Sequence, residues 1–191
     1  MPTSPAAAPS VADLLHDLEV PSARARFSAA KALRMLSETD PRSVYPYLDA
    51  VARLLASENS FLRWDATRTL ANLAGVDGEG KIEALLGRIL APIPGPQMIG
   101  AATSIAAAAN IALAKPYLAE RIAKAILQVQ TAVYQTMECR HIAIGHAIES
   151  LGRFMHLLTN RAPVVTFVRA QLDNPRPATR RKAEKFLRRW G

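Results

Sequence analysis

A side-chain pattern that recurs five times along the chain most constrains its fold. In each copy a leading residue is followed, at offsets of three, seven and ten, by residues that lie on one mainly apolar face of an α-helix. The clearest copy runs from Arg63 through Ala66 and Leu70 to Leu73. The leading positions are residues 26, 63, 98, 141 and 180, which are 37, 35, 43 and 39 residues apart. A period of this length predicts a stack of helical pairs.

Each of these five segments is preceded by another amphipathic segment, and helix-breaking residues separate the two. Asp40 and Pro41 form a suitable N-cap and first turn for a helix that should run through Leu55. Pro116 should open another helix that reaches about Val133. No stretch alternates apolar and polar residues for long enough to form a strand. The pattern therefore predicts an all-α chain of ten helices in five antiparallel pairs.

Two of the second-helix segments carry a more specific pattern, in which an apolar residue and Arg are followed by Ala and then by spaced Leu. They are residues 60–74, SFLRWDATRTLANLA, and residues 179–187, TRRKAEKFL. In these segments the chain resembles the HEAT-repeat family, and the resemblance extends from about residue 10 to the end.

The resemblance implies an α-α superhelix, a right-handed solenoid of five HEAT-like helical pairs. It implies one domain over residues 10–191, after a flexible lead-in of residues 1–9. The repeats should span approximately residues 10–38, 39–76, 77–114, 115–158 and 159–191. HEAT arrays act as scaffolds in many unrelated processes, so the resemblance says much about fold and little about activity.

By the same resemblance, the second helix of each pair should line the concave side of the solenoid. Residues one, five and nine positions after each leading residue point away from the buried direction and should face this concavity. The expected partner-binding residues are Phe27, Lys31, Trp64, Arg68, His146 and Lys185. Thr103, Ala107 and Ser150 should share this face. Phe27 and Trp64 are the expected anchors, since aromatic residues are enriched at binding hot spots; the alternative is that they pack over neighbouring helices.

Positive charge is concentrated at the end of the chain. Of the net charge of +8, seven Lys/Arg and one Glu from Arg176 onward contribute +6, whereas seventeen Lys/Arg and fifteen Asp/Glu before it contribute only +2. In the last helix, Ala183, Phe186, Leu187 and Trp190 should form the buried side. The possible anion-binding residues are Arg181, Lys182, Lys185, Arg188 and Arg189. Two interpretations remain open: a polar cap that keeps a terminal repeat soluble, and a binding surface for anions.

Motifs for catalysis or metal binding are weak. Cys139, His141 and His146 lie at helical offsets that do not converge, so no metal is expected. No glycine pattern for phosphate or dinucleotide binding is present, so no cofactor is expected. Trp64 followed by Asp65 resembles the alkylpurine DNA glycosylases built on HEAT-like repeats, but the nearly neutral body of the chain argues against that chemistry. No residue specifically supports a relation to HEAT-like bilin lyases.

The sequence therefore favours a non-enzymatic HEAT-repeat scaffold or adaptor that binds a protein partner on its concave face. The alternative is a nucleic-acid-binding protein that uses the basic C-terminal helix, with a glycosylase-like or lyase-like enzyme in third place. A cytoplasmic location is expected, because the single cysteine cannot form an internal disulfide and the first residues lack a signal segment. No membrane association is expected, since prolines interrupt the uncharged stretch from Ile89 to Ala114.

Overall fold

The fold consists of long helices, each paired with a shorter one. The computed structural model describes residues 9–191, and this part of the chain is helical, without strands. The long second helices are α2 (Ala23–Thr39), α5 (Ser60–Leu73), α7 (Met98–Ala114), α9 (Met137–Phe154) and α11 (Pro177–Trp190). The first helices are α1 (Val11–Glu19), α3 (Pro41–Val44) with α4 (Leu48–Arg53), α6 (Lys81–Leu90), α8 (Ala119–Ile126) and α10 (Ala162–Arg169).

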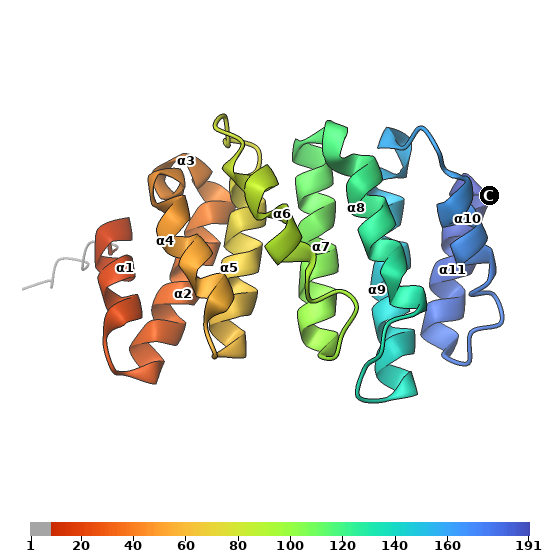
Figure 1. The fold of residues 1–191 in the computed structure, drawn as a ribbon, viewed down its shortest axis with the longest axis horizontal. Helices are drawn as coiled ribbons and strands as arrows, with labels where there is room; N and C mark the ends of the chain where they lie inside the picture. Colours follow the sequence, from red (N-terminus) through yellow and green to blue (C-terminus); the bar gives the residue numbers. More distant parts are fainter. Residues whose placement is uncertain (1–8) are drawn as a thin grey trace, which may run out of the picture.

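The five pairs stand side by side in chain order, from α1 at one end to α11 at the other (Figure 1). Each second helix packs on the second helix of the next pair, so that α2 contacts α5, α5 contacts α7, α7 contacts α9 and α9 contacts α11. First helices pack against this row, as α1 does on α2 and α6 on α7. The arrangement is an α-solenoid, which confirms the predicted all-α class of five helical pairs.

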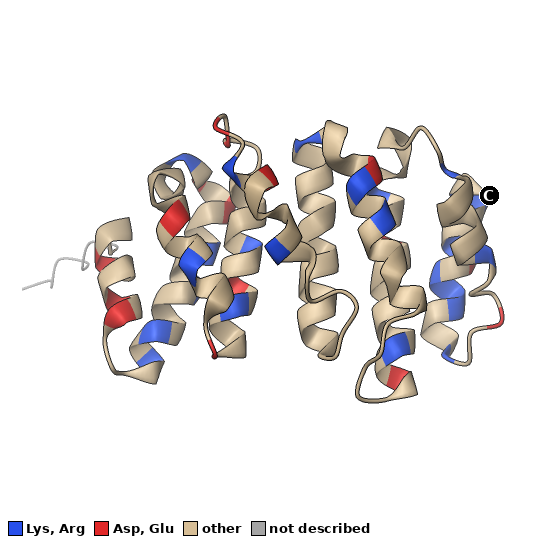
Figure 2. Ribbon diagram, viewed as in Figure 1, with Lys and Arg blue, Asp and Glu red and all other residues tan. Residues whose placement is uncertain are grey.

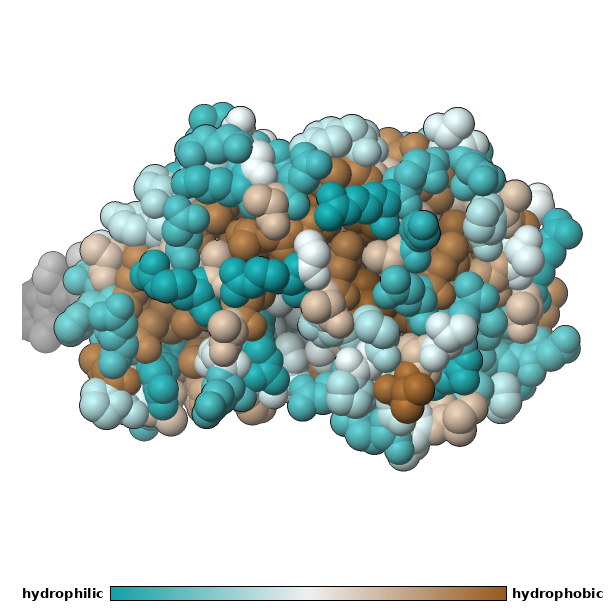
Figure 3. Space-filling model, in the orientation of Figure 1, coloured by the Kyte–Doolittle hydropathy of each residue, from teal (hydrophilic) through white to brown (hydrophobic). Residues whose placement is uncertain are grey.

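The residues at the apolar offsets of the repeat form the core. Leu33, Leu70 and Ile105, all at offset seven, are at most 2% exposed. One apolar cluster runs from α1 to α11, so the core is continuous through the whole array. On the face seen in Figure 3, apolar atoms are recessed between rows of polar side chains. Helix α7 is rich in alanine, and Ala101 and Ala108 are fully buried where it packs between α5 and α9. Small side chains at these positions allow neighbouring backbones to approach closely.

Two of the predicted first helices are shorter or less regular than expected. The segment expected to be one helix from residue 40 to Leu55 consists of α3, the 3-10 turn η1 (Tyr45–Tyr47), α4 and the 3-10 turn η2 (Leu54–Ala56). Pro46 causes the first break, because it has no N–H for the bond to the carbonyl four residues earlier. The segment opened by Pro116 ends with η4 (Leu127–Gln130), so the prediction that it reaches Val133 is wrong by three residues.

In the second and fifth pairs, the leading arginine of the repeat holds the turn between the two helices of the pair. Arg63 donates through one guanidinium nitrogen to the carbonyls of Ser57, at 2.6 Å, and Glu58, at 2.8 Å. Arg180 donates to the corresponding carbonyl of Asn174 at 2.7 Å. The carbonyls of Ser57 and Asn174 each lie six residues before the arginine that binds them. The motif that identified the repeat therefore has a local structural role, since its arginine donates to backbone carbonyls in the connection between the two helices.

A buried acidic side chain joins the second and third pairs. The side chain of Asp77 precedes α6 and accepts from the backbone N–H groups of Lys81 and Ile82, each at 3.0 Å. It also accepts from the Tyr45 hydroxyl at 2.9 Å and forms an ion pair with Lys115 at 3.2 Å. Burial raises the pKa of Asp77, but the bonds from Ile82, Tyr45 and Lys115 outweigh it and hold the pKa below the ordinary value. Asp77 is therefore ionised and serves as a junction between pairs.

Candidate functional site

The exposed side of the second helices carries most of the predicted binding residues. Lys31, Arg68 and Lys185 are exposed, Phe27 is 36% exposed, and Trp64 and His146 are half-buried. Three positions expected on the same face are buried instead: Thr103 at 4%, Ala107 at 2% and Ser150 at 6% exposure. The prediction was wrong there because α7 and α9 pack closely through small side chains, which covers residues that an isolated helix would expose. The basic side chains therefore form two separate groups.

Three aromatic rings from two helices meet at the N-terminal end of this face. The ring centroids of Phe27 on α2 and Phe61 on α5 are 5.7 Å apart, and those of Phe61 and Trp64 are 5.1 Å apart with the rings near perpendicular. Phe61 is 60% exposed. We call Phe27, Phe61 and Trp64 the aromatic edge. Phe61 was not among the residues predicted from the sequence, although its position three residues before Trp64 places both on one side of α5.

Trp64 also packs on the next pair. A Cβ atom added to Gly100 on α7 would lie 3.6 Å from the indole Nε1, so the ring is in van der Waals range of the α7 backbone. Beside the ring is a pocket of about 300 Å³. Its lining residues are Ser60, Trp64, Gln97, Met98, Ile99, Gln135 and Cys139. Both earlier interpretations of the aromatic residues therefore apply: Trp64 packs locally, whereas Phe27 and Phe61 keep exposed ring surface.

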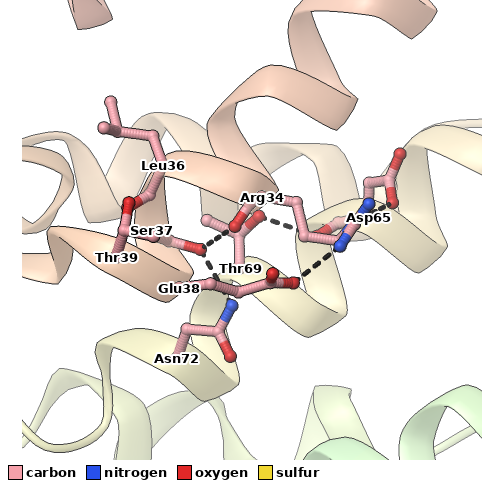
Figure 4. A network of polar contacts seen from close by, with 8 residues as sticks. All are labelled: Arg34, Leu36, Ser37, Glu38, Thr39, Asp65, Thr69 and Asn72. Atoms are coloured by element: carbon pink, nitrogen blue, oxygen red, sulfur yellow. Dashed lines mark hydrogen bonds and ion pairs between the residues drawn. The ribbon is translucent and has the colours of Figure 1, made fainter.

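A polar network lies between α2 and α5 (Figure 4). Arg34 Nε donates to Asp65 at 3.1 Å, and the same guanidinium donates to Glu38 at 2.6 Å. Further along, the amide of Asn72 donates to Ser37 Oγ at 2.9 Å. The carboxylate of Asp65, which follows Trp64 in the sequence, is thus held by an arginine in the seam between two helices.

A second pocket, of about 240 Å³, lies between α9 and α11 near the C-terminus. Its lining residues are Ile148, Glu149, Gly152, Arg153, Lys182, Lys185, Phe186, Arg189 and Trp190. We call this pocket the α9–α11 groove. Ile148 and Phe186 are buried apolar residues. A Cβ atom added to Gly152 would lie 3.3 Å from the Phe186 ring, so Phe186 packs directly on the backbone of α9. The groove therefore has an apolar floor and a charged rim.

The structure divides the possible anion-binding residues into three groups. Lys182 forms an ion pair with Glu149 on α9 at 2.7 Å. Lys185 and Arg189 line the groove, and neither makes an ion pair within residues 9–191. Arg181 and Arg188 are exposed on α11 outside the groove lining. Figure 2 shows the accumulation of Lys and Arg on α11, in contrast to acidic α1 at the opposite end.

The charged residues of α11 perturb two titratable groups on α9. The hydrogen bond from Lys182 lowers the pKa of Glu149 below the ordinary value. Burial lowers the pKa of His146, and the nearby positive charge of Lys182 lowers it further. His146 therefore favours its neutral form, and within the described chain it makes no hydrogen bond. As a predicted partner-binding residue, His146 would therefore present mainly a neutral imidazole.

Trp190 is half-buried and lies under two guanidinium groups. The Cζ atom of Arg189 is 4.8 Å from the ring centroid, and that of Arg161, at the start of α10, is 5.5 Å from it. The predicted buried side of α11 holds for Ala183 and Phe186, at 0% and 5% exposure, whereas Leu187 and Trp190 are partly exposed on α11, the last helix of the described array.

Metal binding and membrane insertion each require a recognisable arrangement of residues. Within residues 9–191, no group of three His, Cys, Asp or Glu side chains is arranged to hold a metal ion. Likewise, no helix in this range is both long and apolar enough to span a membrane. His141 is half-buried, and its Nδ1 atom lacks a hydrogen-bond partner.

The stacked pairs and the exposed second-helix face define an α-solenoid of the armadillo/HEAT type. No family model matches the chain, and no curated protein is significantly similar to it. Among solved structures, the MAST/Orbit N-terminal domain is 13% identical, with a TM-score of 0.58 over 94% of this chain and 82% of that chain. A designed armadillo repeat protein in complex with the peptide (KR)4 is 12% identical, with a TM-score of 0.57 over 95% and 82%. An engineered protein is 17% identical, with a TM-score of 0.57 over 93% and 77%. Identities this low show the fold alone.

Proposed function

We propose that the protein is a cytoplasmic, non-enzymatic adaptor of the HEAT-repeat kind, which holds a segment of a protein partner on its second-helix face. The observation that carries this proposal is the aromatic edge. Phe61 exposes 60% of its surface while its ring contacts Phe27 and Trp64. Aromatic rings held rigidly by their neighbours supply large contact area at a small entropy cost, which is the property of binding hot spots.

The polar residues of this face favour scaffolding over catalysis. Asp65 is engaged by Arg34, and Glu149 is engaged by Lys182. These carboxylates form ion pairs between neighbouring helices, so their role is to hold the helices of the array together. The designed armadillo protein that carries a (KR)4 peptide supports the proposal further, because it is an array of similar fold with a peptide bound to it.

Site-specific photo-crosslinking tests the proposal directly. A photoreactive phenylalanine analogue at position 61 should form a discrete adduct with a protein partner in the source cell. The matched control is Tyr117, an aromatic residue that is 66% exposed in the turn after α7. The same analogue at position 117 should not form that adduct, and Phe27→Ala should weaken the adduct at position 61.

Two outcomes would contradict the adaptor function. The first is the same set of adducts at positions 61 and 117, which would indicate random collisions. The second is an adduct at position 61 that nuclease treatment removes, which would favour the nucleic-acid alternative.

A further inference from the structure

We propose that the α9–α11 groove binds an acidic, extended protein segment and takes up one apolar side chain of that segment. This inference rests on the proposed adaptor function and specifies the chemistry of a second contact. It involves α9 and α11, whereas the aromatic edge belongs to α2 and α5. The two surfaces can therefore be tested independently.

The floor of the groove provides the site for the apolar side chain. Ile148 and Phe186 contribute buried apolar surface, and Gly152 adds no side chain between them. Phe186 packs on the backbone of α9 at Gly152, so the floor is part of the contact between α9 and α11. The volume of about 240 Å³ lies below the roughly 300–1,000 Å³ that is usual for drug-sized ligands. The groove therefore suits one inserted side chain of a longer segment.

The rim of the groove provides the attraction for acidic residues. Four cationic side chains and one carboxylate line it, so its net charge is +3. The single carboxylate, Glu149, is already paired with Lys182. Arg153 donates to the neutral amide of Asn110 at 2.7 Å, so that contact leaves its charge uncompensated. Lys185 and Arg189 are exposed and make no ion pair within the described chain. The unpaired cations thus surround an apolar floor.

The geometry favours a protein segment over a nucleic acid. Non-specific binding of single strands uses open aromatic faces on which bases stack, along a continuous basic track. Here the Trp190 ring already lies under the guanidinium groups of Arg161 and Arg189. The basic residues also do not form a track, because Thr103 is buried between the N-terminal and C-terminal groups. A segment in which carboxylates flank one apolar residue matches both parts of the groove. The carboxylates would meet the cationic rim, and the apolar residue would contact the floor.

Binding of synthetic peptides to the purified protein tests the proposal by fluorescence anisotropy. The probes are short labelled peptides with Glu on both sides of a central Leu, Ile, Phe or Met. One reference set replaces each Glu with Gln, another replaces the central residue with Ala, and a single-stranded oligonucleotide serves as a polyanion. We expect saturable binding of at least one acidic peptide with an apolar centre, and a loss of about tenfold or more in either reference set.

Two charge variants on the same helix locate the site. Lys185→Gln with Arg189→Gln removes two charges from the rim and should weaken peptide binding by about tenfold. Arg181→Gln with Arg188→Gln removes the same charge from α11 outside the groove and should change it by less than about twofold. All four side chains are exposed, so both variants should remain folded. A Phe27→Ala, Phe61→Ala variant should bind the peptides like the unmodified protein, which separates this proposal from the adaptor function.

Several results would overturn the proposal. They are the absence of saturable peptide binding up to about 1 mM, equal binding of peptides that lack the apolar residue, equal losses in the two charge variants, and tighter binding of the oligonucleotide than of any peptide. None of these results would alter crosslinking at position 61, so the adaptor function would stand or fall by its own test.

Discussion

The Nζ atom of Lys115 lies 3.2 Å from a carboxylate oxygen of Asp77, and the two side chains are only 10% and 0% exposed. Lys115 also donates to the backbone carbonyl of Asp77 at 2.8 Å. The residue that follows α7 is thereby fixed to the loop that precedes α6, at the same end of the third pair. An ion pair removed from water in this way is costly to break from one side, because the remaining charge is left uncompensated.

Lys115→Met should therefore lower the free energy of unfolding by about 3 kcal/mol, even though the aliphatic part of the side chain is retained. Urea denaturation followed by circular dichroism measures the change. The control is Lys81→Met, which removes the exposed ion pairs with Asp49 and Glu79 and should cost less than about 1 kcal/mol. Equal losses in the two variants would show that burial of the Asp77–Lys115 pair is unimportant.

The stability contributed by Asp77 should depend on pH. Its pKa is below the ordinary value of about 4. The folded state therefore binds this proton less readily than the unfolded state. The contribution of Asp77 to stability is complete above about pH 4, and it is lost as the pH falls through the pKa that Asp77 has in the folded protein. Asp77→Asn should melt at a lower temperature than the unmodified protein at neutral pH. The difference between their melting temperatures should narrow in acid; a difference that stays constant would contradict the assignment.

The register of α5 can be tested with two neighbouring residues. Leu70 is fully buried, so Leu70→Ala should cost about 2–5 kcal/mol of stability. Arg68 is exposed on the second-helix face, so Arg68→Ala should change stability by no more than about 0.5 kcal/mol. Chemical denaturation of both variants checks the assignment. Similar losses of stability in the two variants would mean that the wrong face of α5 has been assigned to the core.

The loop between α6 and α7 contains a position that only glycine can fill. Gly95 has a φ of 107°, and a Cβ atom there would overlap the carbonyl oxygen of Val133 in the loop before α9. Gly95→Ala should therefore destabilise the protein by at least about 2 kcal/mol. Gly87→Ala is the matched control, because Gly87 is in α6 with no atom near the added methyl group, and it should stabilise by about 0.5–1 kcal/mol. Thermal unfolding distinguishes the two signs.

The repeat pattern was sufficient to predict the second helices, and the reason is physical. Burial at offsets three, seven and ten requires helical geometry, and Leu33, Leu70 and Ile105 occupy equivalent places in the core. The first helices were harder to predict. Their boundaries depend on short-range features such as Pro46. The effect of this proline on the helix becomes clear only when the backbone hydrogen bonds around it are considered one by one.

Residues that act between pairs could not be predicted in the same way. Phe61 contacts Phe27, which is on another helix, so its importance depends on how α2 and α5 are rotated against each other. Nothing in the sequence around Lys115 indicates that Asp77 is its ion-pair partner. Thr103 has the offset of an exposed residue but is buried, because α5 and α9 both pack against α7. Such features follow from the stacking geometry, which one repeat does not encode.

The unbroken contact of α5 with α7, α7 with α9 and α9 with α11 also fixes a length. Neighbouring packed helices are about 8–10 Å apart, so the aromatic edge and the α9–α11 groove are separated by roughly three such steps, or about 24–30 Å. An extended chain advances about 3.3 Å per residue. A partner that occupied both surfaces at once would therefore need about seven to nine residues between its apolar contact and its acidic stretch, which is a spacing that can be searched for in the sequences of candidate partners.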